Sequence, residues 1–244
     1  MKVDLTENSE SIKTIVMGFY DNIKFDKNHR FKSWEHCYNY FNGDSIEIDL
    51  ACLHLSFYLA SWGMYRGSSF LLQKDYKVHE NAVREIVKSE YKVLRGIALQ
   101  KFTSDSGSET VALLFQLIKK LNDIYDKYKP NEENKTDNDD DRSITDTLIT
   151  KILLGTLGCI PAYDRFFIIG IRQSDLSYST LNRKNFNELL DWCKNNKDEI
   201  QEISKEIKYP PMKIVDMYFW SVGEEFDSAK KVQEKKRNFK KETV

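Results

Sequence analysis

Residues 144–172 read ITDTLITKILLGTLGCIPAYDRFFIIGIR, and this stretch contains the clearest local signals for a helical fold. Its first half places apolar residues at helical spacing and predicts an amphipathic helix, which Gly155 and Gly158 interrupt. Pro161 does not continue that helix, because proline lacks a backbone donor and clashes with the preceding turn. Asp164 is well placed to cap a second helix. The apolar face of this second helix is made of Phe166, Phe167, Ile169 and Ile171.

Helical periodicity recurs on both sides of this stretch, while turn residues are scarce. The chain has only 10 Gly and 4 Pro, too few for a many-stranded β architecture. Apolar spacing and caps predict helices over residues 9–23, 33–41, 46–64, 68–73, 79–87, 89–102, 111–128, 143–154, 164–171, 181–207 and 212–231. The helix predicted at 46–64 is apolar nearly all round, which is typical of a helix at the centre of a core. We therefore predict an all-α fold of about ten helices.

The length of 244 residues is enough for one large domain or for two lobes that share a cleft. Hydrophobic residues make up 41% of the chain and charged residues 31%, which is typical of a folded protein. An acidic, polar stretch at 129–142 predicts a flexible surface loop. We expect this loop to join two lobes, residues 1–128 and 143–244, within a single globular domain.

Charge is unevenly distributed along the chain, although the net charge is only -1. Residues 131–141 (NEENKTDNDDD) carry six acidic residues and one lysine. The tail is basic, with Lys230, Lys231, Lys235, Lys236, Arg237, Lys240 and Lys241. A basic face that attracts phosphates can therefore coexist with a nearly neutral total, although each segment is equally typical of a solvated helix end or loop.

The cysteines and the N-terminus favour a cytosolic protein. Cys37, Cys52, Cys159 and Cys193 are far apart and form no Cys-x-x-Cys or Cys/His ligand pair, so we expect reduced, buried thiols. Residues 1–10 lack the apolar stretch of a signal peptide, and no run of about 18 apolar residues predicts a membrane span. The expected location is the cytoplasm.

The order helix, glycine-containing turn, Pro-x-x-Asp and helix at 144–172 resembles the heart of the helix-hairpin-helix DNA glycosylases. In that superfamily a glycine-rich hairpin holds a DNA phosphate, and the aspartate that opens the next helix faces the target sugar. The resemblance covers about 30 of the 244 residues. It implies that Asp164 is the catalytic carboxylate, that Gly155 and Gly158 contact DNA, and that Arg165 lies beside the acid. Lys151 lies on the helix where bifunctional members carry a Schiff-base lysine, but its spacing matches poorly, so we interpret it first as a phosphate contact or a surface lysine.

The implied chemistry suits an aspartate at a helix N-terminus. Breaking an N-glycosidic bond builds positive charge on the deoxyribose, as in glycoside hydrolysis. A carboxylate beside that sugar stabilises the charge and orients an attacking water. The two glycines lie three residues apart rather than two, a departure that suggests an atypical base. We expect either a damaged base or a modified one, for example from viral DNA in host defence.

A second group of residues has the chemistry of a pocket for a flipped base. Glycosylases hold the extruded base by aromatic stacking and polar contacts. Side chains of these kinds are Trp34, His36, Trp62, Tyr65, Arg66 and Tyr163. Ser68 follows Arg66 and Gly67 and suits a DNA phosphate. Aromatic residues at helical spacing more often belong to a core.

Two other classes of protein fit the sequence. Arg30 and His36 resemble the Arg-x(4-6)-His motif of the HEPN ribonucleases, which are also small and all-helical. A helical module that binds a partner protein has the same composition. The four histidines show no metal-ligand spacing on one helix, and no glycine-rich nucleotide loop with its lysine occurs, so we expect neither a metal nor an organic cofactor.

Overall fold

A computed structural model describes the backbone of residues 11–67, 69–103, 107–128, 141–174, 176, 178 and 180–242. Side chains are described for the same residues, except 103, 141–145 and 235–242. Within this described part the chain is helical and contains no strand, as the sequence predicted. The buried hydrophobic residues form one cluster that runs from Ile12 to Phe219.

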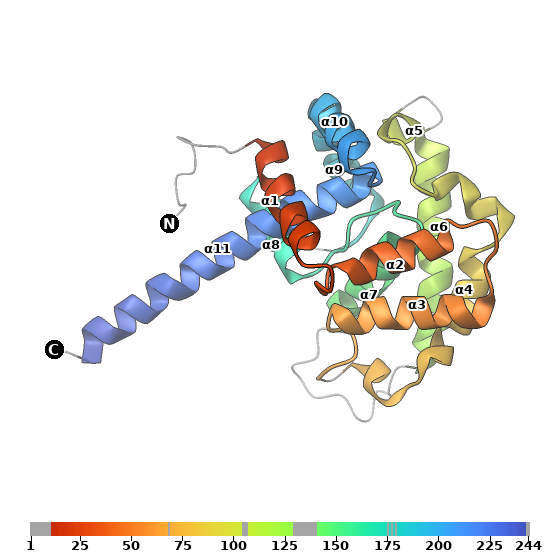
Figure 1. The fold of residues 1–244 in the computed structure, drawn as a ribbon, viewed down its shortest axis with the longest axis horizontal. Helices are drawn as coiled ribbons and strands as arrows, with labels where there is room; N and C mark the ends of the chain where they lie inside the picture. Colours follow the sequence, from red (N-terminus) through yellow and green to blue (C-terminus); the bar gives the residue numbers. More distant parts are fainter. Residues whose placement is uncertain are drawn as a thin grey trace.

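The helices follow one another along the chain as Figure 1 shows. The α-helices are α1 (Ile12–Phe25), α2 (Lys32–Phe41), α3 (Ile48–Ser61), α4 (Glu80–Ile86), α5 (Leu99–Thr103), α6 (Gly107–Tyr125), α7 (Asp141–Thr156), α8 (Arg165–Gln173), α9 (Arg183–Asn195), α10 (Lys197–Ile207) and α11 (Pro211–Glu242). Short 3-10 helices are η1 (Phe70–Gln73), η2 (Tyr76–His79), η3 (Ser89–Leu94) and η4 (Asp126–Tyr128).

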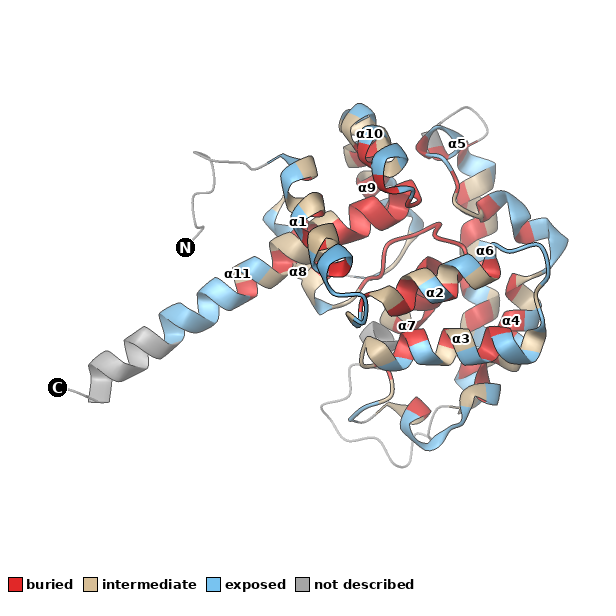
Figure 2. Ribbon diagram, viewed as in Figure 1, coloured by how far each residue is buried: buried red, intermediate tan, exposed pale blue. Residues whose placement is uncertain are grey.

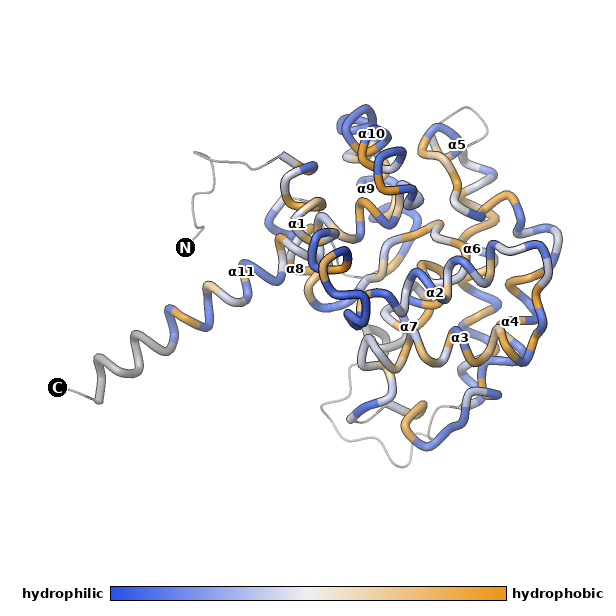
Figure 3. The backbone as a smooth tube through the Cα atoms, in the orientation of Figure 1, coloured by the Kyte–Doolittle hydropathy of each residue, from blue (hydrophilic) through white to orange (hydrophobic). Residues whose placement is uncertain are grey.

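The helix α7 and the segment that follows it lie at the centre of the molecule. α7 contacts α2, α3 and α6, and every residue from Lys151 to Tyr163 is buried (Figure 2). By contrast, α10 lies at the periphery, where its residues are mostly hydrophilic and only three isoleucines face inward (Figure 3). The stretch of sequence that we singled out therefore forms the middle of the core.

The helices α8 and α11 pack against each other more closely than side chains normally allow. A Cβ added to Gly170 of α8 would lie 1.9 Å from the carbonyl oxygen of Phe219, and one added to Gly223 of α11 would lie 1.9 Å from that of Phe166. Only glycine permits this contact, because any side chain would overlap the opposite backbone. The contact fixes the start of α8, and with it Asp164, against α11.

The sequence placed the helix that includes α3 at the centre of the core because it is apolar nearly all round, but one of its faces is exposed. Leu50, Leu53 and Phe57 are 42%, 41% and 60% exposed, although they have the spacing of one helical stripe. The opposite side of the helix, which includes Leu55 and Tyr58, is buried against its neighbours. Hydrophobic composition alone does not say which face of a helix a neighbour covers.

Two helices predicted as continuous are divided in the structure. The segment 181–207 breaks at Asn196, whose side chain donates to the carbonyl oxygen of Trp192 at 2.8 Å and ends α9. The segment 89–102 divides at Gly96, which adopts a positive φ of 53° and donates its N–H to Leu157 at 2.7 Å. Polar side chains and glycine thus supply ends that apolar spacing does not reveal.

The predicted division into two lobes rests on a loop that lies largely outside the described residues, since 129–140 are not part of them. Buried residues from both sides of this loop belong to the same hydrophobic cluster, so the two segments share one core. None of the described helices is both long and apolar enough to cross a membrane. All four cysteines are free and buried, which confirms the expected state of the thiols.

Candidate functional site

Four charged side chains are buried together where α7, α8 and α11 meet. Lys151 Nζ lies 2.8 Å from Asp164 Oδ2, and these side chains are 4% and 15% exposed. Lys213 Nζ lies 2.8 Å from Asp216 Oδ2, and these side chains are 3% and 6% exposed. We call these four residues the lysine–aspartate cluster. Two buried ion pairs this close to each other make the cluster the main candidate for a functional site.

Asp164 caps α8, as the sequence predicted. Its Oδ1 accepts hydrogen bonds from the backbone N–H groups of Phe166 and Phe167, each at 3.1 Å. Its backbone is extended, with a ψ of 177°, which turns the carboxylate back over the first turn of the helix. One carboxylate oxygen therefore holds the helix, and the other faces the Lys151 ammonium.

The turn before Asp164 is held from two sides. Asp216 of α11 accepts the N–H of Ala162 at 2.9 Å, and Thr150 of α7 accepts the N–H of Tyr163 at 2.9 Å. These bonds satisfy two buried backbone donors in a segment that has no helical partners. The position of the Asp164 carboxylate thus depends on both α7 and α11.

Aromatic rings enclose the two lysines. The Nζ atoms of Lys151 and Lys213 lie 4.9 Å and 5.6 Å from the ring centre of Trp62, the residue that ends α3. Lys213 also lies 5.2 Å from the ring centre of Trp34 and 5.4 Å from that of Phe19. Ring faces attract cations, so these contacts stabilise ammonium groups away from water.

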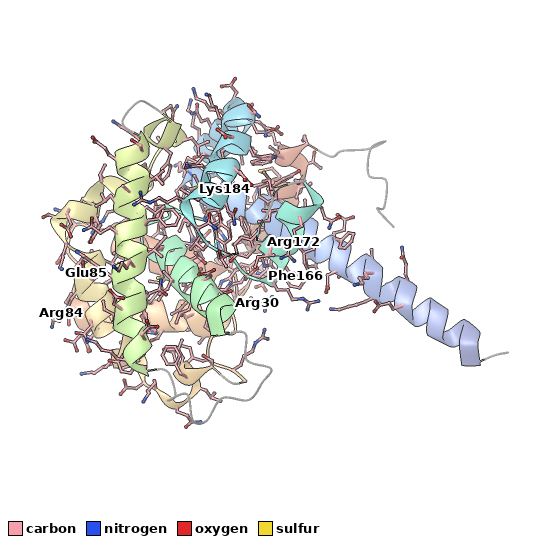
Figure 4. The ribbon with its side chains drawn as sticks, turned by 180° about the vertical axis from the view of Figure 1, so that it is seen from behind. Arg30, Arg84, Glu85, Phe166, Arg172 and Lys184 are labelled. Atoms are coloured by element: carbon pink, nitrogen blue, oxygen red, sulfur yellow. The ribbon has the colours of Figure 1, made fainter. Side chains whose placement is uncertain are left out.

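The aromatic layer extends to the surface. Phe31 stacks on Trp62 with ring centres 4.8 Å apart, and the guanidinium of Arg30 lies 5.8 Å from the Trp62 ring centre. Trp220 meets Trp62 and Phe166 edge-on, with ring centres 6.0 Å and 5.2 Å apart. Figure 4 shows Arg30 and Phe166 on the same part of the molecule. Because Arg30 is exposed and Trp62 half-buried, this layer separates the lysines from solvent.

A buried tyrosine adds a neutral group near the carboxylates. Burial, and to a smaller extent the charge of Asp216, holds the pKa of Tyr58 well above its usual value. Tyr58 therefore stays a phenol rather than a phenolate at any ordinary pH. Its ring lies against Gly155, where an added Cβ would come within 2.4 Å of it.

The cost of burying its charges makes the lysine–aspartate cluster a candidate functional site. Moving a charge out of water costs roughly several kcal/mol of free energy. Apolar residues of similar volume commonly give the folded protein equal or greater stability than a buried ion pair does. Groups whose charge is costly to bury concentrate at functional sites. An aspartate and a lysine that touch each other beside a half-buried indole are suited to bind and react with a polar group.

Of the residues predicted to line a base pocket, the structure brings Trp62 and Trp34 to the cluster. Trp34 is buried and donates its Nε1–H to the carbonyl oxygen of Leu154 at 3.0 Å, so its polar atom is already bonded. His36 is exposed on the other side of α2, because residues two apart on a helix point about 200° apart. The prediction that His36 belongs to this pocket is therefore wrong.

Tyr65 and Tyr163 occupy other places. The hydroxyl of Tyr65 bonds with Ser56 Oγ at 3.1 Å and with His79 Nε2 at 2.8 Å, and His79 Nδ1 bonds with the Tyr125 hydroxyl at 2.6 Å. We call Ser56, Tyr65, His79 and Tyr125 the histidine cluster. Tyr163 is 1% exposed and packs on other aromatic rings of the core. Neither tyrosine is free to stack on a base.

Arg66, a further residue of the predicted site, is not at the cluster. Arg66 folds back on Gly63, where an added Cβ would lie 3.0 Å from the guanidinium carbon, and the residue is exposed. Ser68 lies outside the described residues. The phosphate contact expected at this turn therefore stays a prediction.

The glycines of the predicted hairpin are buried, and this removes the phosphate contact expected of them. Gly155 lies within α7 against Tyr58, and Gly158 packs on Pro210 and Tyr38. The N–H of Gly158 donates to Leu153 at 2.9 Å. These glycines allow close packing inside the core, so their N–H groups are not presented to DNA.

Arg165 is 64% exposed and forms an ion pair with Asp227 of α11. It therefore lies at the edge of the site, beside Asp164, and remains available to a ligand.

The two residues of the ribonuclease motif, Arg30 and His36, are not brought together. Arg30 lies against Trp62, and within the described residues no hydrogen bond or ion pair joins it to His36.

Sequence reasoning missed half of the cluster. Lys213 and Asp216 were not predicted as site residues, although they interrupt the otherwise apolar run Met212–Trp220 with opposite charges three positions apart. On a helix this spacing puts both side chains on one face. A charged pair on the apolar face of a long helix is the signal in the sequence that indicates this buried polar site.

Among the described residues, no group of three or more His, Cys, Asp or Glu side chains is placed to hold a metal ion. Comparison of the chain with protein families, with curated proteins and with solved structures finds no match. The candidate function is therefore argued from the geometry of the site and from the local resemblance of residues 144–172.

Proposed function

We propose that this protein is a DNA glycosylase whose reacting groups are Asp164 and Lys151. The observation that supports the proposal is the 2.8 Å contact between Lys151 Nζ and Asp164 Oδ2 beside the Trp62 ring. The two residues are 13 apart in sequence and come from different elements, so the fold creates this contact. A carboxylate and an aromatic surface suit base excision, and an amine adds a covalent route to it.

The proposed reaction begins with the loss of the base. The C1′–N bond breaks, its electron pair leaves with the base, and the base takes up a proton. The deoxyribose then carries positive charge, which the Asp164 carboxylate stabilises. In the hydrolytic route, water adds to C1′ and releases one proton, and an abasic site remains.

Lys151 offers a second route. In its neutral form the amine attacks C1′ in place of water, loses a proton, and opens the sugar ring to give an imine between Nζ and C1′. Water later hydrolyses this imine and restores the lysine. Burial beside Trp62 and the contact with Asp164 place the amine where such an attack is possible, and Asp164 can accept its proton.

The proposal requires the aromatic layer to move when DNA binds. With Lys151 and Asp164 only 4% and 15% exposed, a flipped nucleotide reaches them only if neighbouring side chains shift. Among these neighbours, Arg30 is exposed and Trp62 is half-buried. We expect the fluorescence of Trp62 to change when the protein binds duplex DNA with an abasic site, and the change to be absent in Trp62→Phe.

The test is base excision from a panel of duplexes that carry deaminated, oxidised, alkylated or otherwise modified bases. Alkali cleavage or an abasic-site endonuclease reveals the product. We expect Asp164→Asn to lower single-turnover excision about 100-fold or more, because a neutral amide stabilises a cationic sugar poorly. Retained activity in Asp164→Asn would exclude the proposed mechanism.

A matched control removes a carboxylate elsewhere. Glu85 is 12% exposed and pairs with Lys88 and Lys120, and it lies on the other side of the molecule from Phe166 (Figure 4). Glu85→Gln therefore tests the effect of losing an ion-paired carboxylate as such, and we expect it to retain excision. Borohydride trapping separates the two routes, since only an imine on Lys151 is reduced to a permanent crosslink, which Lys151→Gln would abolish.

The same preparations distinguish the other classes of protein. Cleavage of RNA that disappears in His36→Ala would point to the ribonuclease reading of Arg30 and His36. Absence of both activities, together with a stable partner protein that copurifies, would point to a non-enzymatic module. The choice between a repair substrate and a modified viral base follows from which duplex of the panel is cut.

A further inference from the structure

We propose that the C-terminal part of α11, residues 228–242, is a basic arm that binds the phosphate backbone of duplex DNA. This inference rests on the proposed function for the choice of DNA, and it adds the surface by which the substrate is held. The arm is outside the lysine–aspartate cluster and contributes no reacting group.

The arm extends away from the body of the protein. The first turns of α11, from Pro211 to Met217, are fully buried, whereas the residues from Ser228 to Glu234 are exposed. Figure 1 shows the end of α11 projecting beyond all the other helices, and Figure 2 shows the change from buried to exposed along its length. At a rise of 1.5 Å per residue the arm is about 22 Å long.

The charge of the arm matches a polyanion. Residues 228–242 read SAKKVQEKKRNFKKE and contain seven Lys or Arg residues and two Glu, in a chain with a net charge of -1. Lys230 and Lys231, the two of these cations whose side chains the structure describes, are exposed. Duplex DNA carries about one negative charge per 1.7 Å of its axis, so a basic helix of this length faces many phosphates.

The apolar residues of the arm do not suit a second copy of the chain or a membrane. Beyond Ala229 the arm contains only Val232 and Phe239, one apolar residue per heptad. A coiled coil needs two apolar positions in each heptad, and a membrane-surface helix needs a broad apolar face. A phosphate backbone needs neither.

The base of the arm touches the candidate site. Asp227, the residue before the arm, forms ion pairs with Lys231 and with Arg165, which directly follows Asp164. About two turns earlier on α11, Trp220 packs edge-on against both Phe166 and Trp62. DNA that lies along the arm is therefore directed toward the lysine–aspartate cluster.

The experiment measures binding to a short unmodified duplex by fluorescence anisotropy over a range of salt concentrations. The test variant replaces Lys235, Lys236, Arg237, Lys240 and Lys241 by Gln in the full chain. The control variant replaces five exposed lysines of the body by Gln, namely Lys24, Lys92, Lys101, Lys184 and Lys194. Both variants lose the same net charge, so the comparison isolates the place of the charge.

We expect the arm variant to bind about 10-fold or more weakly at moderate salt, with a slope of log affinity against log salt that is smaller by roughly 3 to 5. The control variant should keep both its slope and most of its affinity. Equal losses in the two variants, or no loss in the arm variant, would overturn the proposal. A tighter complex with duplex RNA than with DNA would also overturn it, as would binding to phosphatidylserine vesicles in place of DNA.

A change of oligomeric state in the arm variant, measured by light scattering, would likewise show that the arm joins copies of the chain and would contradict a DNA contact. Because the duplex is unmodified, the measurement does not depend on catalysis. Arm-dependent binding together with full excision by Asp164→Asn would remove the proposed mechanism and leave the arm in place. Loss of excision in Asp164→Asn without arm-dependent binding would keep the proposed mechanism and remove the arm proposal.

Discussion

The molecule contains two buried polar clusters that differ in charge. In the histidine cluster both ring nitrogens of His79 bond with tyrosine hydroxyls, and burial lowers the pKa of His79 to about 3. The ring is therefore neutral, and its polar atoms are satisfied by other neutral groups. In the lysine–aspartate cluster, two ammonium groups and two carboxylates are buried beside aromatic rings. A neutral, fully bonded network stabilises a core, whereas buried charges mark a place where the protein tolerates a cost in free energy.

The largest effect should come from breaking one ion pair of the charged cluster. Lys213→Met leaves the Asp216 carboxylate buried without its cation, and we expect the free energy of unfolding to fall by about 3–5 kcal/mol. Urea denaturation measures the change. In the double variant Lys213→Met, Asp216→Asn the amide oxygen still accepts the Ala162 N–H, so most of the stability should return. A single variant within about 1 kcal/mol of the parent would mean that the pair is not buried as described.

A smaller loss should follow from opening the histidine cluster. His79→Ala removes the partner of the Tyr125 hydroxyl and one partner of the Tyr65 hydroxyl, and it leaves a cavity. We expect the free energy of unfolding to fall by about 2–4 kcal/mol, measured by the same denaturation. Excision of the base, measured well below the melting temperature, should stay at the level of the parent. A fall in excision as large as that of Asp164→Asn would contradict the distinction between a structural and a functional cluster.

The smallest effect is a dependence of stability on pH that His79 imposes. An unfolded histidine binds its proton near pH 6.5, whereas folded His79 does so only near pH 3, so the unfolded state holds more protons between these values. Stability therefore falls as the pH falls through this window, by about 1.4 kcal/mol per pH unit at most. Thermal unfolding of the parent and of His79→Gln between pH 7 and 5 should show a flatter profile for the variant. Parallel profiles would mean that His79 is protonated in the folded protein.

The local features of the candidate site were accessible from the sequence. The helix–turn–helix at 144–172 and the cap at Asp164 depend on residues that are close in the chain. The contact between Lys151 and Asp164 was not predicted, because it joins two elements and depends on how α7 packs beside the start of α8. The same local reasoning assigned Gly155 and Gly158 to DNA, because a glycine that permits a phosphate to approach and one that permits a tyrosine to approach look alike in sequence.

What the sequence by itself determined is the helical class, the state of the cysteines and the start of α8, since periodicity, composition and capping act over a few residues. Only the tertiary structure decided that Trp62, Lys151 and Lys213 meet, because these residues lie on three helices far apart in the chain. The tertiary structure also decided that α3 exposes Leu50, Leu53 and Phe57 and that α11 leaves the body after its buried first turns. Burial depends on what covers a face, and no short stretch of sequence contains that information.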